Sequence, residues 1–475
     1  MGEMNTRLFI DGAFVAGEGQ VETAFEPALG KPLAEVASAS DAQIEAAVTA
    51  ADSAYRDWSK RTPRERSAAL LAIADAIEAR ADQLALVESR NAGKPLRFVK
   101  AAELVNVADV FRFYGTAIRN MPAPAAGNYR SPNRVSMVRR DPIGVVAQIA
   151  PWNYPLLMAA WKIAPAIAAG NAVVIKPSEM TPLSLLVLSE IFADILPAGV
   201  VNVICGNGPD VGNRLISHDL VRMISLTGDV RTGRAVLQAA AGNRIKRTHL
   251  ELGGKAPVIV CADADLDKLV ETLREASFYN AGQDCTAACR IFAHADVVQG
   301  LTDRLEAMVG TLVYGRPERD DVEFGPVISQ RQLERVDGFV TRARQEGFEV
   351  MQGAAPEAEG YFFAPTLVAA PIEAEIVQKE VFGPVLSITP FADEQQAVDW
   401  ANASEYGLGS SVWSRNGSQA MAIANALEYG VTWVNTHGVM ATEMPHGGMK
   451  NSGYGSDLSM QSLIDYTQIR HIMIE

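Results

Sequence analysis

Short apolar runs alternate with amphipathic segments along most of the chain. Each run is short and rich in β-branched side chains and ends in a turn, and the segment after it carries apolar residues at helical spacing. The pairs are "GVVAQIAP" before 156–169, "AVVIKPSEMTP" before 183–196, "VVNVICGNGPDVG" before 211–217, and "VRMISLTGDVRTG" before 232–241. This alternation predicts an α/β fold, a parallel sheet with helices on both faces that is Rossmann-like.

The flanking regions follow the same logic. Residues 41–86 predict two amphipathic helices, the second with Thr62 as cap and Pro63 at its first position. The stretch 122–140 is rich in Pro, Gly and Asn and then becomes strand-like, which indicates an excursion from the main domain. A second α/β series runs from "APVIVC" (256–261) to about Asn435, and the tail "YTQIRHIMI" alternates like an edge strand.

Composition and charge narrow the class of protein. The 475 residues allow two or three domains, and a formal charge of −14 argues against nucleic acid and anionic membranes as partners. Four cysteines form neither a disulfide framework nor a Cys/His metal motif, so we expect reduced thiols, a cytoplasmic setting and no metal. The N-terminus shows no signal-peptide pattern. The apolar stretch 145–175 is broken by Pro151, Lys162 and Pro165, which favours a buried core over a membrane helix.

Glycine-rich turns follow two of the predicted strands. Gly208 and Gly212 lie in "GNGPDVG", and Gly228 and Gly233 lie in "TGDVRTG". Such turns let backbone N–H groups approach a pyrophosphate, although turn glycines without a ligand explain them equally well. In "KPSE", Lys176 and Glu179 suit ribose hydroxyls, and the carboxylate would favour NAD over NADP; a solvated charge pair is the alternative.

Three further residues have the chemistry of an acyl-transfer site. Asn153 in "PWNYP" offers a neutral donor for an oxyanion, or else caps the following helix. Glu251 in "ELGGK" suits a general base, or else is a turn charge. Cys285 follows a predicted helix and suits a nucleophile, although most single cysteines are core residues and Asp284 beside it should raise its pKa. Cys289 is expected to be structural.

Taken in order, the motifs of the chain resemble the aldehyde dehydrogenase superfamily over nearly its whole length. They are "PWNYPLLMAAWK", "KPSE", "TGDVRTG", "ELGGK", "GQDCTAACR", "KEVFGP", "WVNTH" and "PHGGMKNSGYG". "KRTHLELGGKAPVIV", "YNAGQDCTAACRI", "EMPHGG" and "SGYGSDLSM" are most similar to the gamma-aminobutyraldehyde (4-aminobutyraldehyde) dehydrogenases of putrescine degradation. The resemblance implies that Cys285 attacks an aldehyde, Asn153 holds the oxyanion, and Glu251 activates the water that cleaves a thioester.

The resemblance also implies a cofactor, three parts and an assembly. The cofactor is NAD, and the implied NAD-binding residues are Ile149, Pro151, Trp152, Lys176, Ser178, Glu179, Gly208, Gly212, Thr227, Gly228, Asp229, Gly233, Leu252, Glu380 and Phe382. The implied parts are an NAD-binding domain (1–120 and 141–252), a catalytic domain (253–445) and a small β oligomerisation flap (121–140 and 455–475). The assembly is a homo-oligomer, a dimer or tetramer. Asp229 departs from the Ser or Thr of many relatives; its carboxylate is repulsive beside a pyrophosphate but is a good helix cap.

Substrate selection must come from other side chains. Asp284 is expected to attract the cationic tail of a small-molecule aldehyde, or else to cap a turn. Tyr154, Trp161 and Tyr279 match tunnel positions of aminoaldehyde-oxidising relatives, and Glu103 is a candidate second anion. The rival substrates are betaine aldehyde and longer aminoaldehydes. Rival classes are a catalytically silent binding protein on this scaffold and a cofactor-free cysteine hydrolase.

Overall fold

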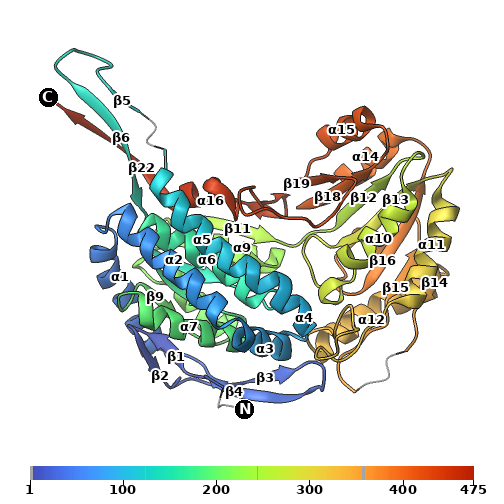
Figure 1. Cartoon of the computed structure of the whole chain (residues 1–475), viewed down its shortest axis with the longest axis horizontal. Helices are drawn as coiled ribbons and strands as arrows, with labels where there is room; N and C mark the ends of the chain where they lie inside the picture. The colour runs from blue at the N-terminus through green and yellow to red at the C-terminus, as the bar shows by residue number, and fades with distance from the viewer. Residues whose placement is uncertain (1–3, 123–124, 243, 356–358) are drawn as a thin grey trace.

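The computed structural model describes residues 4–122, 125–242, 244–355 and 359–475. Two α/β lobes lie side by side, and a thin β-sheet carrying the C-terminus projects from one of them (Figure 1). The predicted α/β class is confirmed: each lobe is built on a mainly parallel sheet. The parts of the predicted domains at 1–3, 123–124, 243 and 356–358 lie outside the described residues.

The first lobe contains an eight-stranded sheet in the order β2-β1-β9-β8-β7-β10-β11-β21. The five strands β9, β8, β7, β10 and β11 run parallel, and the flanking strands pair antiparallel. The strands are β1 (Leu8–Ile10), β2 (Ala13–Val15), β7 (Val145–Ile149), β8 (Ala172–Lys176), β9 (Val201–Val203), β10 (Val221–Gly228), β11 (Arg247–Leu252) and β21 (Gly453–Tyr454).

Helices cover this sheet because their apolar faces complete its core. Ser40 and Thr62 begin the first two helices with capping boxes, and Pro63 occupies the first helical position as predicted. The elements are α1 (Asp41–Trp58), α2 (Pro63–Ala79), α3 (Ala81–Ala92), α4 (Leu96–Phe98), η1 (Val99–Glu103), α5 (Leu104–Ala117), η2 (Ile118–Asn120), α6 (Pro155–Ala169), α7 (Leu183–Ile195), η3 (Gly208–Gly212), α8 (Asn213–Ser217) and α9 (Val230–Ala240). The helix predicted from 211 begins at Asn213, because the glycine segment forms a separate wide turn.

The second lobe contains a seven-stranded sheet in the order β14-β15-β16-β13-β12-β18-β19, in which only β14 is antiparallel. Its strands are β12 (Ala256–Val260), β13 (Ala288–His294), β14 (Glu349–Gln352), β15 (Thr366–Ala369), β16 (Val385–Phe391), β18 (Gly409–Trp413) and β19 (Val431–Val434). Its helices are α10 (Leu266–Ala276), η4 (Tyr279–Gly282), α11 (Val298–Thr311), α12 (Gln330–Gln345), α13 (Glu375–Gln378), α14 (Glu394–Asn402) and α15 (Gly417–Ala426).

The projecting sheet joins the chain end to a much earlier segment. Strand β22 (Thr467–Ile474) pairs antiparallel along all of β6 (Val135–Pro142), and β5 (Ala126–Gly127) pairs on the other side. The preceding α16 (Ser459–Asp465) and Tyr466 pack in the first lobe's core instead, so only β22 of the tail enters this sheet. Two small sheets complete the fold, β3 (Val21–Glu26) with β4 (Lys31–Ala37) and β17 (Tyr406–Gly407) with β20 (Met449–Lys450).

The long apolar stretch folds as β7, α6 and β8 in the first core. Every α6 residue except Leu157 is buried, and Pro165 lies within the helix. Among the described residues, no helix has both the length and the apolar character that crossing a bilayer requires.

Candidate active site

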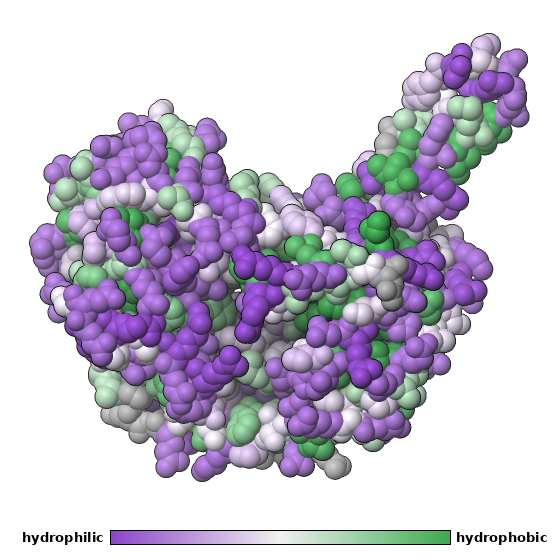
Figure 2. Space-filling view, turned by 180° about the vertical axis from the view of Figure 1, so that it is seen from behind, coloured by the Kyte–Doolittle hydropathy of each residue, from purple (hydrophilic) through white to green (hydrophobic). Residues whose placement is uncertain are grey.

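A single cavity of about 1540 Å³ extends between the two lobes. Its floor is formed where β7, β8, β10 and β11 end, which is where parallel sheets place ligands. Figure 2 shows the face of the molecule hollowed near its centre between the lobes. Every site residue predicted from the sequence lines this cavity except Gly233. A Cβ at Gly233 would lie 2.6 Å from Leu252 Cδ1, so that glycine allows α9 to pack on Leu252 and does not face a ligand.

A strained turn delivers Cys285 to the cavity. Asn280, Ala281 and Gly282 all have positive φ, and a Cβ at Gly282 would lie 2.2 Å from the Gly383 carbonyl oxygen. Buried hydrogen bonds hold the turn, because Asn280 Nδ2 donates to the carbonyl oxygens of Asn153 (2.9 Å) and Gln283 (3.2 Å). Backbone strain of this kind persists only where surrounding contacts impose it, and it is common at functional sites.

Asn153 lies directly against this turn. Its Nδ2 donates to the Gln283 carbonyl oxygen at 3.1 Å, and Tyr154, not Asn153, occupies the cap position of α6. The alternative of a helix-capping Asn153 is therefore wrong. A side-chain amide has two N–H donors, so one remains for an oxyanion formed at the neighbouring Cys285.

Glu251 lies at the end of β11, buried, with the carboxyl oxygens free of hydrogen bonds to any described residue. Burial, together with the negative charge of Asp457, raises the pKa of Glu251 to about 8. A carboxylate with a pKa close to the working pH suits a general base.

Asp457 belongs to a buried charged group behind Glu251. Lys162 Nζ lies 3.5 Å from Asp457 Oδ2, and His249 Nε2 lies 3.3 Å from Asp457 Oδ1. Burial by itself would raise the pKa of Asp457, but the charges of Lys162 and His249 outweigh it and hold the pKa below its ordinary range. Asp457 therefore keeps its negative charge and favours the protonated form of Glu251.

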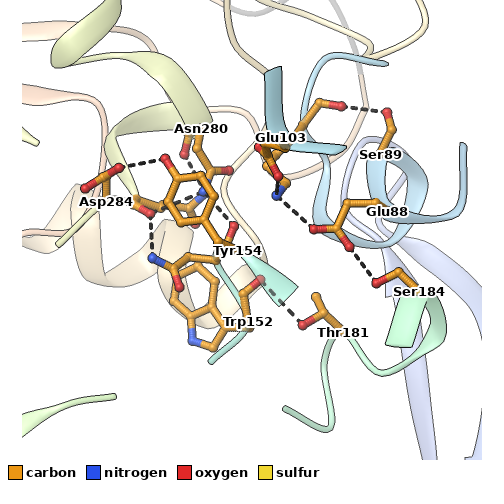
Figure 3. Close-up of polar contacts among 12 residues, drawn as sticks. Glu88, Ser89, Glu103, Trp152, Tyr154, Thr181, Ser184, Asn280 and Asp284 are labelled. Atoms are coloured by element: carbon orange, nitrogen blue, oxygen red, sulfur yellow. Dashed lines mark hydrogen bonds and ion pairs between the residues drawn. The ribbon is translucent and has the colours of Figure 1, made fainter. Parts of the chain in front are cut away.

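The carboxylate of Asp284 caps the turn, which is one of the two roles predicted, and its attraction for a cationic tail stays a prediction. Oδ1 accepts the Thr286 backbone N–H at 2.7 Å and the Thr286 hydroxyl at 2.8 Å, which caps the turn. Oδ2 accepts the Tyr154 hydroxyl at 2.7 Å (Figure 3), and both residues line the cavity. Burial, then the charges of Glu251 and Asp284, raise the pKa of the Cys285 thiol well above its ordinary value. Asp284 therefore raises the pKa of the Cys285 thiol, as the sequence predicted.

Tyr154, Tyr279 and Glu103 line the far end of the cavity, and Glu103 belongs to a buried ion group that also includes Glu88 (Figure 3). The rings of Tyr154 and Tyr279 lie 6.3 Å apart, and the Tyr279 hydroxyl donates to Glu103 Oε1. Glu103 also binds Lys94 Nζ, which in turn lies 2.9 Å from Glu88 Oε1 and 4.8 Å from the centre of the Tyr154 ring. Glu103 is therefore paired with a fully buried lysine, and its role as a second anion for the substrate stays a prediction.

The opposite end of the cavity has the donors and acceptors of a dinucleotide site. Lys176 Nζ, buried at the end of β8, lies 3.7 Å from Glu179 Oε2 at the cavity rim. Glu380 Oε1 accepts the Gly254 N–H at 2.9 Å, and burial raises the pKa of Glu380 to about 7. A Cβ at Gly208 would meet no atom within 4 Å, so the backbone there is open to a ligand. These features fit two ribose-hydroxyl contacts joined by a backbone-lined channel.

Asp229 is a helix cap. Its Oδ1 accepts the Thr232 N–H at 2.7 Å at the start of α9, so the carboxylate satisfies the helix end.

Phe382 has a positive φ of 60° and its ring meets Trp152 edge-on at 5.3 Å. Cys289 lies in β13, with Sγ 4.0 Å from the Ala256 carbonyl oxygen, in agreement with a structural role.

Sequence reasoning missed several residues of the site. His446 lies with a ring nitrogen near both Cys285 and Glu251 and its ring 5.3 Å from that of Trp161. Lys94 and Glu88 were also missed. The motif "EMPHGG" contained the signal for His446, but nothing in the sequence places it beside Cys285.

Comparison with known proteins agrees with this geometry. The sequence pattern of the aldehyde dehydrogenase family matches residues 14–472. The chain is similar to PnpE from Pseudomonas sp. WBC-3 (37% identity, TM-score 0.96, covering 99% of this chain and 98% of that one), and PnpE has also been solved with nicotinamide adenine dinucleotide.

Two further solved structures are similar over nearly the full length. They are a betaine aldehyde dehydrogenase variant from Staphylococcus aureus with NAD+ (33%, TM-score 0.96, 99% and 98%) and an aldehyde dehydrogenase variant from Bacillus cereus (33%, TM-score 0.96, 99% and 97%). With a match over nearly all of its length and a cavity that gathers a cysteine, a buried carboxylate and a side-chain amide, the chain belongs to the aldehyde dehydrogenase family.

Proposed function

We propose that this aldehyde dehydrogenase oxidises ω-aminoaldehydes with NAD, and that 4-aminobutyraldehyde, giving 4-aminobutanoate, is its preferred substrate. The observation that supports this substrate is the direction of two hydrogen bonds. The hydroxyls of Tyr154 and Tyr279 both donate to carboxylates, those of Asp284 and Glu103.

Those donations decide what the tyrosines offer a ligand. A phenol has one donor hydrogen and two acceptor lone pairs, so a hydroxyl that donates to a carboxylate presents only lone pairs elsewhere. Burial, together with the neighbouring carboxylates, raises the pKa of both phenols well above the ordinary value, so both keep their protons. The far end of the cavity is therefore an acceptor for N–H donors, which a primary ammonium has and a quaternary ammonium lacks.

Charge works in the same direction. A cationic tail about 4 Å from Asp284 gains roughly 4 kcal/mol at an effective dielectric of 20. In the buried group, Lys94 is flanked by both Glu88 and Glu103, so two carboxylates face one ammonium. The far end thus has more carboxylates than ammonium groups and is also rich in hydrogen-bond acceptors. Both properties support an aminoaldehyde as substrate.

The chemistry follows from the residues at the near end. The Cys285 S–H bond breaks and its proton passes to solvent water, Sγ forms a bond to the aldehyde carbon, and the carbonyl electron pair moves to the oxygen. The Cys285 N–H and the remaining Asn153 N–H stabilise that oxyanion. NAD, when bound, supplies the acceptor for the hydride that turns this thiohemiacetal into a thioester. Glu251 then takes a proton from water, the water oxygen attacks the thioester carbon, and the C–S bond breaks to release the acid.

The second candidate is betaine aldehyde, supported by the 33% identity to a betaine aldehyde dehydrogenase. A trimethylammonium group gains about 0.5–2 kcal/mol over aromatic faces, and Trp161, Tyr154 and Tyr279 provide such faces. Steady-state kcat/KM for 4-aminobutyraldehyde, betaine aldehyde and pentanal with NAD separates the candidates. We expect the order as written; betaine aldehyde in first place would overturn the proposed substrate, and equal values would remove charge selection.

The variant Asp284→Asn tests the charge itself. It keeps an oxygen for the Tyr154 hydroxyl and removes the negative charge. We expect KM for 4-aminobutyraldehyde to rise far more than KM for pentanal. Equal changes for the two aldehydes would show that Asp284 acts only as a turn cap.

We further propose that the chain assembles as a homo-oligomer, a dimer or tetramer, through the sheet of β5, β6 and β22. Hydrophobic side chains gather on this projecting arm (Figure 2), and Ile469, Met473 and Ile474 of its edge strand β22 are 64%, 50% and 52% exposed. Exposed apolar side chains on an edge strand indicate a partner surface. Light scattering of Ile469→Lys should show smaller particles than the wild type; an unchanged mass would exclude Ile469 from the interface.

The four free cysteines support a reducing, cytoplasmic setting.

A further inference from the structure

Three side chains with metal-binding atoms converge in the cavity. Glu251, Cys285 and His446 come from distant parts of the chain, and a carboxyl oxygen, the sulfur and a ring nitrogen all lie within 4.8 Å of one another. The sequence indicated no metal site, because motif reasoning looks for ligands at short spacings, and these three are brought together only by the fold.

Each of the three atoms is available. The Glu251 carboxyl oxygens accept no hydrogen bond from a described residue, and Cys285 is a free thiol that is half-buried at the cavity wall. The backbone of His446 is fixed by paired bonds to Asp457, with N–H to O distances of 2.8 and 2.7 Å, so the Cα that carries the imidazole has a set position at the cavity.

Neighbouring polar groups are, in contrast, occupied. The ring nitrogens of His437 lie 2.8 Å from Ser411 Oγ and 2.7 Å from the Thr286 carbonyl oxygen. Both oxygens of Asp284 accept hydrogen bonds from protein. The available donors are therefore one sulfur, one nitrogen and one carboxylate, with open cavity on the fourth side.

We propose that Glu251, Cys285 and His446 bind Zn²⁺ and that bound zinc inhibits the enzyme reversibly. Three protein ligands of S, N and O type with an open fourth position form a standard tetrahedral zinc set. Zinc bond lengths of about 2.0–2.3 Å place ligand atoms about 3.5 Å apart, so small side-chain rotations close the site. The Cys285 S–H bond breaks, the proton leaves to solvent and a Zn–S bond forms, with no change of oxidation state.

The consequence is a block on both chemical steps. The sulfur that must attack the aldehyde and the carboxylate that must activate water are held by the same ion. Zinc should therefore compete with the aldehyde. Mg²⁺ and Ca²⁺, which prefer all-oxygen ligands, should have no effect at equal concentration.

The activity test uses butanal and NAD with free Zn²⁺ set by a chelating buffer, so its outcome does not depend on the aminoaldehyde proposal. We expect competitive inhibition that excess chelator reverses. The variant His446→Gln should need at least about 100-fold more zinc for half inhibition relative to its own activity, since even outer-sphere changes cost 10–100-fold in affinity. The matched control His294→Gln removes a histidine near Asp296, outside the cavity, and should keep wild-type sensitivity. Equal sensitivity of His446→Gln and wild type would overturn the site.

A second readout does not need turnover. Titration of the protein with Co²⁺ should produce the near-ultraviolet absorption of a cobalt–thiolate bond. Cys285→Ser should abolish that band, and His446→Gln should shift the titration to higher cobalt concentration. A band that persists in Cys285→Ser would place the thiolate ligand at Cys205, Cys261 or Cys289 and contradict the proposal, as would the absence of a band in the wild type.

Discussion

The cavity has a reacting end, at Cys285 and Glu251, and a tail end, at Tyr154 and Tyr279. The two ends differ in how many of their buried polar groups are hydrogen-bonded within the protein. At the reacting end, the Glu251 carboxyl oxygens and the buried Thr227 hydroxyl accept or donate no hydrogen bond among the described residues. At the tail end, the hydroxyls of Tyr154 and Tyr279 and the carboxylates that receive them are all engaged. Unpaired buried polar groups cost free energy, so their presence at one end alone marks where ligand atoms and water must complete the network.

This difference separates chemistry from selection. The reacting end would accept almost any aldehyde, because its free groups address the carbonyl and the water. The tail end has its proton positions already set. Under the proposed function, it distinguishes ligands by what they can donate. Variants that act on only one end are therefore the strongest test of the contrast.

The largest expected effect is at the reacting end. Replacing Glu251 by Gln removes the base, and general-base catalysis contributes about 10²–10⁴-fold, so turnover should fall by that amount. The KM for the aldehyde should fall with it, because the acylated enzyme accumulates. Rapid mixing should still show a first burst of NADH, because hydride transfer precedes water attack. Loss of the burst together with turnover would place Glu251 before the thioester.

The pH dependence of the same step has a defined sign. The pKa of Glu251 is about 8, above its ordinary 4.5, so the carboxyl is protonated and inactive as a base below about pH 8. The rate of thioester hydrolysis should therefore rise from pH 7 to 9 in the wild type. In Glu251→Gln this rise should disappear; a profile of unchanged shape would assign the titration to another group.

The next effect is on stability at the tail end. Lys94→Met leaves Glu88 and Glu103 buried without their counterion, and breaking a buried pair costs about 3–5 kcal/mol. Urea unfolding should show a loss of that size. Lys379→Met, which breaks an exposed pair with Glu405, is the matched control and should lose less than about 1 kcal/mol. Equal losses of unfolding free energy in the two variants would mean that the buried group stabilises the protein no more than the exposed pair does.

A smaller and more selective effect is expected from Tyr279→Phe. It removes one acceptor for the substrate ammonium, and a hydrogen bond to a charged group contributes about 1.5–3 kcal/mol, so kcat/KM for 4-aminobutyraldehyde should fall roughly 10- to 100-fold. Betaine aldehyde and pentanal cannot donate to that oxygen and should change little. A uniform fall for all three aldehydes would reduce Tyr279 to a packing residue.

The smallest effect concerns the cofactor end. Asp229→Ser keeps a helix-capping oxygen for the Thr232 N–H and removes a negative charge beside the expected pyrophosphate. A charge at a helix start is worth about 0.3–1 kcal/mol, so NAD should bind equally or a few-fold more tightly by calorimetry. A large loss of NAD affinity would show that the carboxylate itself contacts the cofactor.

Local patterns were sufficient for much of the fold and for the reacting end. Thr62 with Pro63 marks a helix start, β-branched runs mark the parallel strands, and Cys285, Glu251 and Asn153 lie in short motifs at strand or helix ends. These predictions rest on chemistry within a few residues, which a sequence displays directly.

The tail end required the three-dimensional arrangement. Lys94 precedes α4 and pairs with Glu103 at the end of η1, and Tyr279 reaches Glu103 from the other lobe. His446 reaches Cys285 only because the segment after β19 folds back over the cavity. A charged residue looks the same in a sequence whether it is solvated or paired in a core, so the pairing of Glu103 with Lys94 could not be predicted from the sequence.

The covalent role of Cys285 can be tested by the mass of a trapped intermediate. Glu251→Gln is mixed with NAD and butanal, quenched in acid, digested and examined by mass spectrometry. We expect a butanoyl group on the peptide that contains Cys285, at close to one per chain, formed together with NADH and absent when NAD is omitted. NADH produced with no acyl group at Cys285 would contradict the covalent mechanism.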